Sequence, residues 1–449
     1  MDTNLLDIAE KAVNLAERQG ADQAEVYIGR IQSFEIEAEN NAIKYASERI
    51  DAGIGIRTIV GKKIGFAYVT TLDDTDIQEA VSNSLSLARA SIPDPDFVSL
   101  PDYSSDYHQT RGLFDKRIQD LTSEEAAEII IRIIDTSKQL LVDRDYAIEA
   151  AVYTSSSSSA IVNSLGISKS ESKTFISVNG TSIIKEDGDQ TLSYDYQLSR
   201  NFDDIDPEWV GESSASLAIK ALHPKTIEGG EMPVIFAPLG ASAILGRGFA
   251  GAINAEEVQM GRSYIADAFG EKIASDKLEI IDDGVLPSGI GSRTYDAEGY
   301  RSQRTVIIEG GVLKSLLHNS YTANKDDVEN TGNASRPSYS GLPSISTSNF
   351  MVKPGKGDLE EFISETKRGV VCRNTGDLPN MTTGDLSAMI MEGYYIEDGE
   401  IQHALKNTLI GINMKQLLQR IAHVGNDIRT ASAMITPSLV IERANITSG

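Results

Sequence analysis

Side chains that commonly bind metals are scarce in this sequence of 449 residues, which contains one cysteine and five histidines. Cys372 alone can form neither an intramolecular disulfide nor a zinc site built from thiolates. No two histidines lie within five residues of each other, so no helix presents two imidazoles in the spacing of a zinc peptidase motif. We therefore expect no metal-binding residue in this chain, and a zinc site built from dispersed ligands is the disfavoured alternative.

Positive charge is also in short supply. The chain has 66 aspartates and glutamates against 41 lysines and arginines, which leaves a formal net charge of -25. Proteins that bind nucleic acid normally present a basic surface that neutralises phosphates. The short basic run Gly-Lys-Lys at 61–63 is typical of a hairpin turn. We therefore expect no direct contact with nucleic acid.

Long apolar runs are missing as well. The sequence has no stretch of about 18 apolar residues, the length needed to span a membrane, so we expect no membrane contact. The N-terminal segment is amphipathic and carries acidic residues, unlike the basic and apolar parts of a signal peptide. We therefore expect the protein to be cytoplasmic.

The patterns that are present predict several domains, because a single hydrophobic core stops growing at roughly 250–300 residues. Residues 1–95 show a helix, alternating strands and a second helix. A proline-rich linker follows, and residues 115–225 repeat the same order. Thr122 and Glu125 have the spacing of a helix capping box. The two units predict one α+β N-terminal domain that arose by duplication.

The character of the sequence changes after residue 225. Residues 226–449 contain many short strands separated by glycine turns, with one helix predicted near 239–252. Two segments, 306–317 and 394–405, share the pattern Ile-Glu-x-Gly-x-aliphatic and predict similar hairpins. The fold class is therefore α+β, with a β-rich, barrel-like C-terminal domain.

Several isolated candidates for chemistry have simpler structural interpretations. The serine run at 155–159 predicts a turn rather than a nucleophile. Cys372 lies in an apolar stretch and is expected to be a buried, unreactive thiol. Glu256 and Glu257 are adjacent, so they diverge on a helix and favour a solvated face over a pair of catalytic carboxylates.

Three further candidates lie in the β-rich half. Residues 282–284, Asp-Asp-Gly, predict an acidic turn, because the spacing of a calcium loop is missing. His318 and His403 each follow one of the two similar hairpins. We expect both to be partly exposed strand residues rather than metal ligands.

Three segments carry a resemblance to a known family. They read AFGEKIASDKLEIIDDG at 268–284, NMTTGDLSAMIMEGYYIEDGE at 380–400 and HVGNDI at 423–428. In these segments the chain resembles the TldD/PmbA family, which is classed with metalloproteases and sometimes described as modulators of DNA gyrase. The likeness covers nearly the whole chain. The family-signature positions are Thr383, Gly384, Asp385, Gly425, Asn426 and Asp427.

The same resemblance identifies a degenerate metal motif. TldD-like members carry H-E-x-x-x-H on a helix of the C-terminal domain and a further cysteine ligand near the C-terminus. The resemblance aligns that motif with residues 246–251, where Gly246 and Gly251 replace the histidines and Arg247 replaces the glutamate. No cysteine follows Val424. The resemblance therefore implies a PmbA/TldE-like member that lacks the motif.

For function, the resemblance implies a non-catalytic subunit that associates with a TldD-like partner and acts on peptides or unfolded segments. This chain is expected to hold no cofactor, because the zinc would belong to the partner. Two alternatives stay open: a self-sufficient peptidase that acts as a homodimer, and a regulatory protein-binding module that acts on gyrase or a toxin system. A homodimer is also open for the isolated chain.

Overall fold

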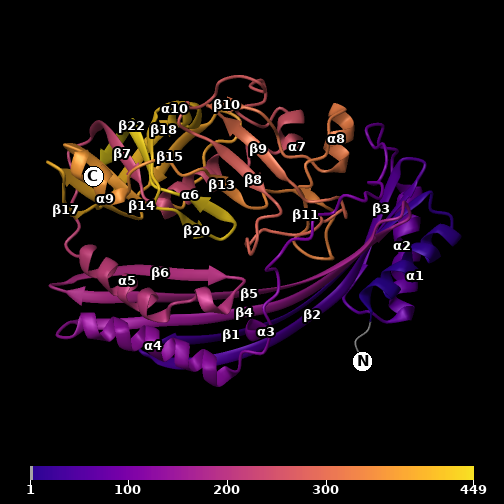
Figure 1. Cartoon of the computed structure of the whole chain (residues 1–449), viewed down its shortest axis with the longest axis horizontal. Coiled ribbons are helices and arrows are strands. Elements are labelled where there is room, and N and C mark those ends of the chain that lie inside the picture. The colour runs from indigo at the N-terminus through magenta and orange to yellow at the C-terminus, as the bar shows by residue number, and fades with distance from the viewer. Residues whose placement is uncertain (1–3) are drawn as a thin grey trace.

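The N-terminal half forms a single six-stranded antiparallel sheet in the order β3-β2-β1-β4-β5-β6. The computed structural model describes residues 4–449 (Figure 1). The two sequence units meet at the centre of the sheet, where Glu25 of β1 lies opposite Asn163 of β4 and Ala38 lies opposite Ala150. The elements are α1 (Leu5–Arg18), β1 (Gln23–Glu39), β2 (Ala42–Val60), β3 (Lys63–Val69), α2 (Asp74–Ala90), α3 (Lys116–Gln119), α4 (Ser123–Leu141), β4 (Asp145–Asn163), β5 (Ser168–Glu186), β6 (Asp189–Ser199), a 3₁₀ turn (Phe202–Asp204) and α5 (Pro207–Lys220).

Helices cover one face of this sheet. Alternate residues of β1, such as Val26, Ile28 and Ile36, are fully or almost fully buried in clusters with apolar residues of the helices. The predicted capping box is confirmed, because Thr122 accepts from Glu125 N and the Glu125 side chain accepts from Thr122 N. In Figure 1, α4 lies on the face of the sheet that is turned away from the C-terminal domain. The opposite face, whose β1 and β4 residues are half-buried, is turned toward that domain.

The turn predicted for the serine run is wrong. Residues 155–159 lie inside β4, where they pair with residues 29–33 of β1 and 171–175 of β5. Both neighbouring strands satisfy the backbone here, so the run continues as a strand in spite of its turn-forming composition.

The C-terminal half is built from two main sheets. One has the order β10-β9-β8-β13-β21-β20, and the larger has the order β15-β18-β22-β7-β14-β16-β17, with β19 also paired to β22. These strands and the helix α6 enclose a core that includes Phe236, Phe249 and Phe350. The predicted α+β class, with a curled β-rich C-terminal body, is confirmed.

The C-terminal elements follow in chain order. They are β7 (Gly230–Phe236), α6 (Pro238–Gly248), α7 (Ala255–Gln259), β8 (Ile280–Asp283), β9 (Arg304–Glu309), β10 (Val312–Leu313), α8 (Ser320–Asp326), β11 (Ala334–Ser335), β12 (Ser344–Ile345), β13 (Phe350–Val352), α9 (Leu359–Glu365), β14 (Arg368–Asn374), β15 (Asp385–Met389), β16 (Glu392–Glu397), β17 (Glu400–Ala404), β18 (Thr408–Asn413), α10 (Met414–Gln419), β19 (Ile421–Val424), β20 (Arg429–Ala431), β21 (Met434–Thr436) and β22 (Leu439–Ser448). The two similar hairpins are confirmed as β9–β10 and β16–β17.

Three local predictions for this half need correction. The helix expected near 239–252 ends at Gly248. Asp282 is not in an acidic turn but in β8, where its buried carboxylate accepts from Asn333 Nδ2 at 2.7 Å and from Ser348 N at 2.8 Å. His318 is a buried loop residue just before α8 rather than a partly exposed strand residue. His403 does lie half-buried in β17, as expected.

The two halves are held together by a buried ion cluster. Arg57 Nη2 of β2 donates to Glu25 Oε2 of β1 at 2.7 Å and to Glu298 Oε1, from the C-terminal half, at 3.2 Å. Arg336 of the C-terminal half pairs with the other oxygen of Glu25. Between residues 4 and 449, no helix is both long and apolar enough to cross a membrane.

Candidate functional site

Helix α6 contains the first residues of the degenerate motif that the family resemblance aligns with residues 246–251. The helix begins at Pro238, whose missing N–H costs nothing in the first turn. It packs very closely on β14, since a Cβ added at Gly240 would lie 2.3 Å from the carbonyl oxygen of Cys372. At its end, Tyr264 OH donates to Gly248 O at 2.6 Å. Small residues are therefore required by packing along part of this helix.

The three degenerate motif residues do not converge on one point. A Cβ at Gly246 would lie 3.2 Å from Met434 Cε in β21, whereas one at Gly251 would lie 3.2 Å from Met381 Cε. Gly251 also lies beyond the end of α6. Arg247 is exposed and its Nη1 donates to Gly376 O at 2.6 Å. None of the three offers a metal ligand, because glycine has no side-chain donor atom and a guanidinium has no free lone pair.

Potential metal ligands gather elsewhere. In residues 4–449, one group of three could contact a single ion, and it consists of Glu186, Asp187 and His223. These residues come from the end of β5, the β5–β6 turn and the segment after α5, and they are at least partly exposed. Arg144 already pairs with Glu186. This group does not line the pocket beside α6.

The first signature segment forms a tight turn. Asn380 Oδ1 accepts from Thr382 N at 2.9 Å and Thr383 N at 3.1 Å. Gly384 adopts a positive φ of 82°, which favours glycine. Asp385 accepts from Asn413 Nδ2 at 2.8 Å and Thr383 Oγ1 at 2.9 Å, and these hydrogen bonds lower the pKa of the Asp385 carboxyl. The segment fixes the backbone at the start of β15 and places Met381 beside Gly251.

The second signature segment is also a structural lock. Asp427 accepts from Ser438 N at 3.0 Å and from Ser438 Oγ at 2.6 Å. A Cβ at Gly425 would lie 2.4 Å from Asp427 Oδ1, so only glycine leaves room for this contact. Asn426 N donates to Gly357 O at 2.7 Å. Both signatures hold loops in place, and their side chains do not form a catalytic pair.

A cavity of about 390 Å³ lies beside α6, between strand β6 of the N-terminal sheet and the C-terminal half. Figure 1 shows α6 and β20 on the side of the C-terminal half that faces β6. We call this cavity the α6 pocket. Its lining residues are Tyr194, Tyr196, Leu239, Ser242, Ala243, Gly246, Arg247, Ala250, Thr347, Asn374, Thr375, Ala431, Ser432 and Met434. It therefore contains two of the three motif positions.

One wall of the α6 pocket was missed by the sequence analysis. Tyr194 and Tyr196 stack with ring centroids 6.4 Å apart and planes 14° apart. Asn374 Nδ2 donates to Tyr194 OH at 2.7 Å, which joins the N-terminal sheet to β14. The alternation Tyr-Asp-Tyr at 194–196 was a signal that two aromatic side chains share one face of a strand.

An ion cluster supports this wall. Asp195 pairs with Arg373 of β14, at 2.9 Å, and with Arg429 of β20. Burial alone would raise the pKa of Asp195, but the contacts with Arg429 and Arg373 hold it below the usual range. Arg373 also pairs with Glu392 at 2.6 Å, whose pKa is raised by burial in spite of that contact. The cluster is a second connection between the halves.

The remaining candidates have structural roles. Cys372 is fully buried in β14, and burial raises the pKa of its thiol to about 12, so it is the unreactive residue predicted. Burial lowers the pKa of His318. Glu257 pairs with the exposed Arg262 at 2.7 Å, as expected for a solvated face.

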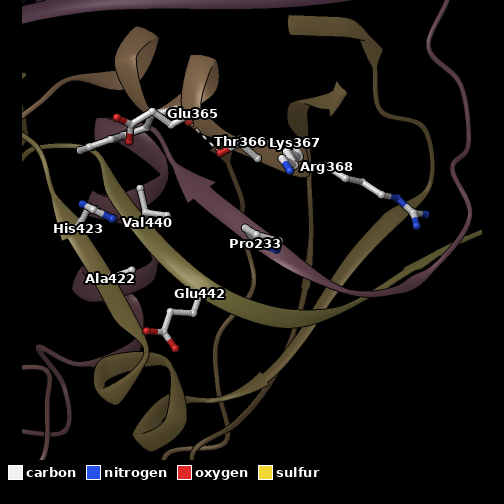
Figure 2. A pocket seen from close by; sticks show the side chains of 10 residues that line it. Pro233, Glu365, Thr366, Lys367, Arg368, Ala422, His423, Val440 and Glu442 are labelled. Atoms are coloured by element: carbon white, nitrogen blue, oxygen red, sulfur yellow. Dashed lines mark hydrogen bonds between the residues drawn. The ribbon is translucent and has the colours of Figure 1, made fainter. Parts of the chain in front are cut away.

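A second cavity lies on the C-terminal half, beside α9. Figure 2 shows its lining, which includes His423, Glu442 and Arg368 around a volume of about 280 Å³. The His423 ring packs 5.7 Å from the ring of Phe362. In Figure 2, the side chains of His423 and Glu442 point in different directions. Their placement does not resemble an acid–base pair.

Comparison with known proteins gives matches along nearly the whole chain. Models of the PmbA/TldA metallopeptidase match as domain 1 over residues 24–88, as the central domain over 116–222 and as the C-terminal domain over 229–448. Uncharacterized protein MJ0231 of Methanocaldococcus jannaschii is 28% identical over 96% of this chain and 98% of its own. Metalloprotease PmbA of Escherichia coli O157:H7 is 28% identical over 98% of this chain and 96% of its own.

Other relatives are named TldD homologs, and one from Haemophilus influenzae is 24% identical over 92% of this chain and 87% of its own. Among solved structures, TldE of Thermococcus kodakarensis superposes with a TM-score of 0.90 at 24% identity and covers 98% of this chain and 100% of its own. A Thermotoga maritima protein named as a putative modulator of a DNA gyrase superposes with a TM-score of 0.89 at 24% identity and covers 99% of this chain and 100% of its own. These two likenesses show the fold.

Proposed function

Because the chain belongs to the PmbA/TldD family, we propose that it is a PmbA/TldE-like, non-catalytic subunit of a TldD/TldE-type zinc metalloprotease complex. The observation that carries the proposal is the lack of metal-ligating side chains at residues 246–251, at and just after the end of α6. Gly246 and Gly251 have no side-chain ligand atoms. A Cβ added at each would meet a different neighbour, Met434 for Gly246 and Met381 for Gly251. No histidine lies between His223 and His318, and no cysteine follows Val424.

The chemistry of Arg247 supports the same conclusion. A zinc peptidase needs neutral or anionic ligands and a carboxylate that accepts a proton from the metal-bound water. A guanidinium stays protonated at every relevant pH and repels a divalent cation. In the proposed complex, the zinc and the hydrolytic step therefore belong to the TldD-like subunit.

The proposed contribution of this chain is to hold substrate and to support its partner. The half-buried face of the N-terminal sheet is polar and turned toward the C-terminal half. The α6 pocket lies at the β6 edge of that sheet. Extended peptides or unfolded segments are the proposed substrates, because strand edges and polar clefts bind extended backbone through main-chain hydrogen bonds.

The test begins with the purified chain alone. Zinc content is measured, and cleavage of an unfolded protein such as reduced casein is followed with and without a chelator. We expect no stoichiometric zinc and no chelator-sensitive cleavage. Adding a TldD-like subunit from the same source is expected to give cleavage together with a stable complex in gel filtration.

Other results would overturn the proposal. Stoichiometric zinc, or cleavage by the isolated chain as a homodimer, would identify a self-sufficient peptidase. Cleavage by the TldD-like subunit that neither needs nor binds this chain would favour a separate regulatory role.

A further inference from the structure

The α6 pocket has the features of an anion site that no catalytic role explains. Resting on the proposed function, we propose that it binds a carboxylate group of an extended peptide, namely the C-terminal carboxylate. Arg247 supplies the charge, Thr375 a hydroxyl donor, and the stacked Tyr194 and Tyr196 the wall along which the last residues lie. The volume of about 390 Å³ lies within the range of roughly 300–1,000 Å³ found for small-ligand pockets.

The charge of the α6 pocket is the first feature that favours an anion. Arg247 is the one charged residue in the described lining, and no carboxylate of residues 4–449 lies within ion-pair distance of it. Its guanidinium uses one donor for Gly376 O, while an arginine has five. The pocket therefore carries a net positive charge in a chain whose formal net charge is -25.

The ion cluster behind the tyrosine wall does not neutralise the positive charge of Arg247. Arg373 and Arg429 share Asp195, and Arg373 also pairs with Glu392. Two cations therefore face two carboxylates, so this cluster is balanced. The free donors of Arg247 are the ones available to an anion, and arginine binds a carboxylate through two parallel hydrogen bonds.

The second step is an orphaned hydroxyl. Thr375 lines the pocket with only 2% of its surface exposed, and its Oγ1 has no hydrogen-bond partner in the described part of the chain. Buried polar atoms are nearly always paired, so each exception needs an explanation. The oxygen itself is covered, so a ligand oxygen would supply the missing acceptor after a small shift of the neighbouring side chains.

The third step is the shape of the surroundings. Strand β20 pairs with β21 only, so its other edge is free of described strands next to Ala431 and Ser432 of the lining. Leu239, Met434 and the two tyrosine rings give apolar surface for one or two side chains. An extended peptide end combines backbone groups, side chains and a carboxylate, and it matches all three kinds of surface.

The experiment measures binding of labelled peptides to the full chain by fluorescence anisotropy. The first probe is an N-terminally labelled Ala-Ala-Tyr-Ala with a free C-terminus, the second is its C-terminal amide, and the third is an amide with one glutamate inside the sequence. We expect the free acid to bind roughly tenfold more tightly than either amide, as expected for a charge-assisted hydrogen-bond pair.

Variants assign the effect to the pocket. Arg247→Ala and Thr375→Val are expected to weaken binding of the free acid, and Arg247→Ala is expected to remove most of its preference over the amide. Arg247→Lys should keep part of that preference, because the charge remains while the fork geometry is lost. The matched control is Arg368→Ala, an exposed arginine of the other cavity, which should change nothing.

Stability measurements distinguish a loss of binding from a loss of folding. Thr375→Val removes a hydroxyl that has no partner, so the midpoint of urea unfolding should stay the same or rise while binding weakens. Equal affinity for acid and amide, or an unchanged preference in Arg247→Ala, would overturn the proposal. Tight binding of the glutamate amide would show that the pocket recognises a side-chain carboxylate instead of the chain end.

A failure of this proposal can be distinguished from a failure of the proposed function. Binding is measured on this chain without a partner, whereas the subunit role is tested by zinc content and cleavage. A chain that cleaves peptides but still prefers the free acid would overturn only the subunit role. A zinc-free chain that treats acid and amide alike would overturn only the carboxylate site.

Discussion

Replacing Arg57 with methionine should cost several times more stability than the same replacement at an exposed arginine. The side chain of Arg57 is 8% exposed, and its partners Glu25 and Glu298 are 1% and 2% exposed. Its Nη2 serves both carboxylates, at 2.7 and 3.2 Å. Methionine retains most of the apolar stem, so the loss is mainly that of charge and hydrogen bonds rather than of packing.

The expected loss of stability depends on the hydrogen-bond and ion-pair partners that each carboxylate keeps after the substitution. Glu25 retains Arg336, but Glu298 keeps only the amide of Ser320 as a donor among the hydrogen bonds of the described chain. Removing one partner of a buried ion pair typically costs about 3–5 kcal/mol, because a charge stays buried without compensation. We expect a loss of that size in the free energy of unfolding, measured by urea titration followed by circular dichroism and tyrosine fluorescence.

The control and a rescue separate charge from packing. Arg132→Met breaks a pair with Glu208 in which both side chains are about half exposed (52% and 49%), and exposed pairs contribute only about 0–1 kcal/mol. Glu298→Gln in the Arg57→Met background should restore part of the loss, since it removes the unpaired charge but can still accept from the Ser320 amide. If Arg57→Met cost no more than Arg132→Met, the cluster would not hold the halves together as argued.

Three further outcomes follow from other sites. Cys372 should resist Ellman's reagent in the native protein and react with one equivalent after unfolding, because burial raises the pKa of its thiol to about 12; rapid native labelling would contradict its placement. Gly53→Ala should destabilise by about 1–3 kcal/mol in urea titration, since its Cβ would lie 2.3 Å from the ring of Tyr339, and a neutral effect would refute that contact. Burial and the charge of Glu298 raise the pKa of Asp296 to about 7, so Asp296 binds a proton on folding and its contribution to stability grows as pH falls. Between pH 8 and pH 6 the free energy of unfolding should therefore rise by about 1 kcal/mol, and a fall over that range would contradict the assignment.

Much of the fold could be predicted from local patterns. The capping box at Thr122 and the hairpins at 306–317 and 394–405 depend on short-range signals, and the structure confirms them. The joining of the two N-terminal units in one sheet, with Glu25 opposite Asn163, depends on a pairing distant in sequence, which no local pattern encodes. The serine run shows the same limit, because two neighbouring strands override its turn composition.

The candidate site was only half predictable for a related reason. The family resemblance identifies Gly246, Arg247 and Gly251 as positions without metal ligands, but the wall formed by Tyr194 and Tyr196 belongs to the other half of the chain. The buried environments of His318 and Asp282 also arise from tertiary packing, and composition around them gave no indication of it.

The glycines of α6 thus have two different physical explanations, and separating them clarifies what the helix does. Gly240 lies so close to Cys372 O that any side chain would force the helix off β14, so its role is packing. Gly246 instead faces Met434 and the pocket, where a Cβ would meet only a flexible side chain. A larger residue is therefore sterically tolerable at 246, and glycine there leaves free volume beside Arg247. Gly246 thus has no side chain that could bind a metal, and the space it leaves lies next to a guanidinium without a carboxylate partner, where the proposed carboxylate would bind.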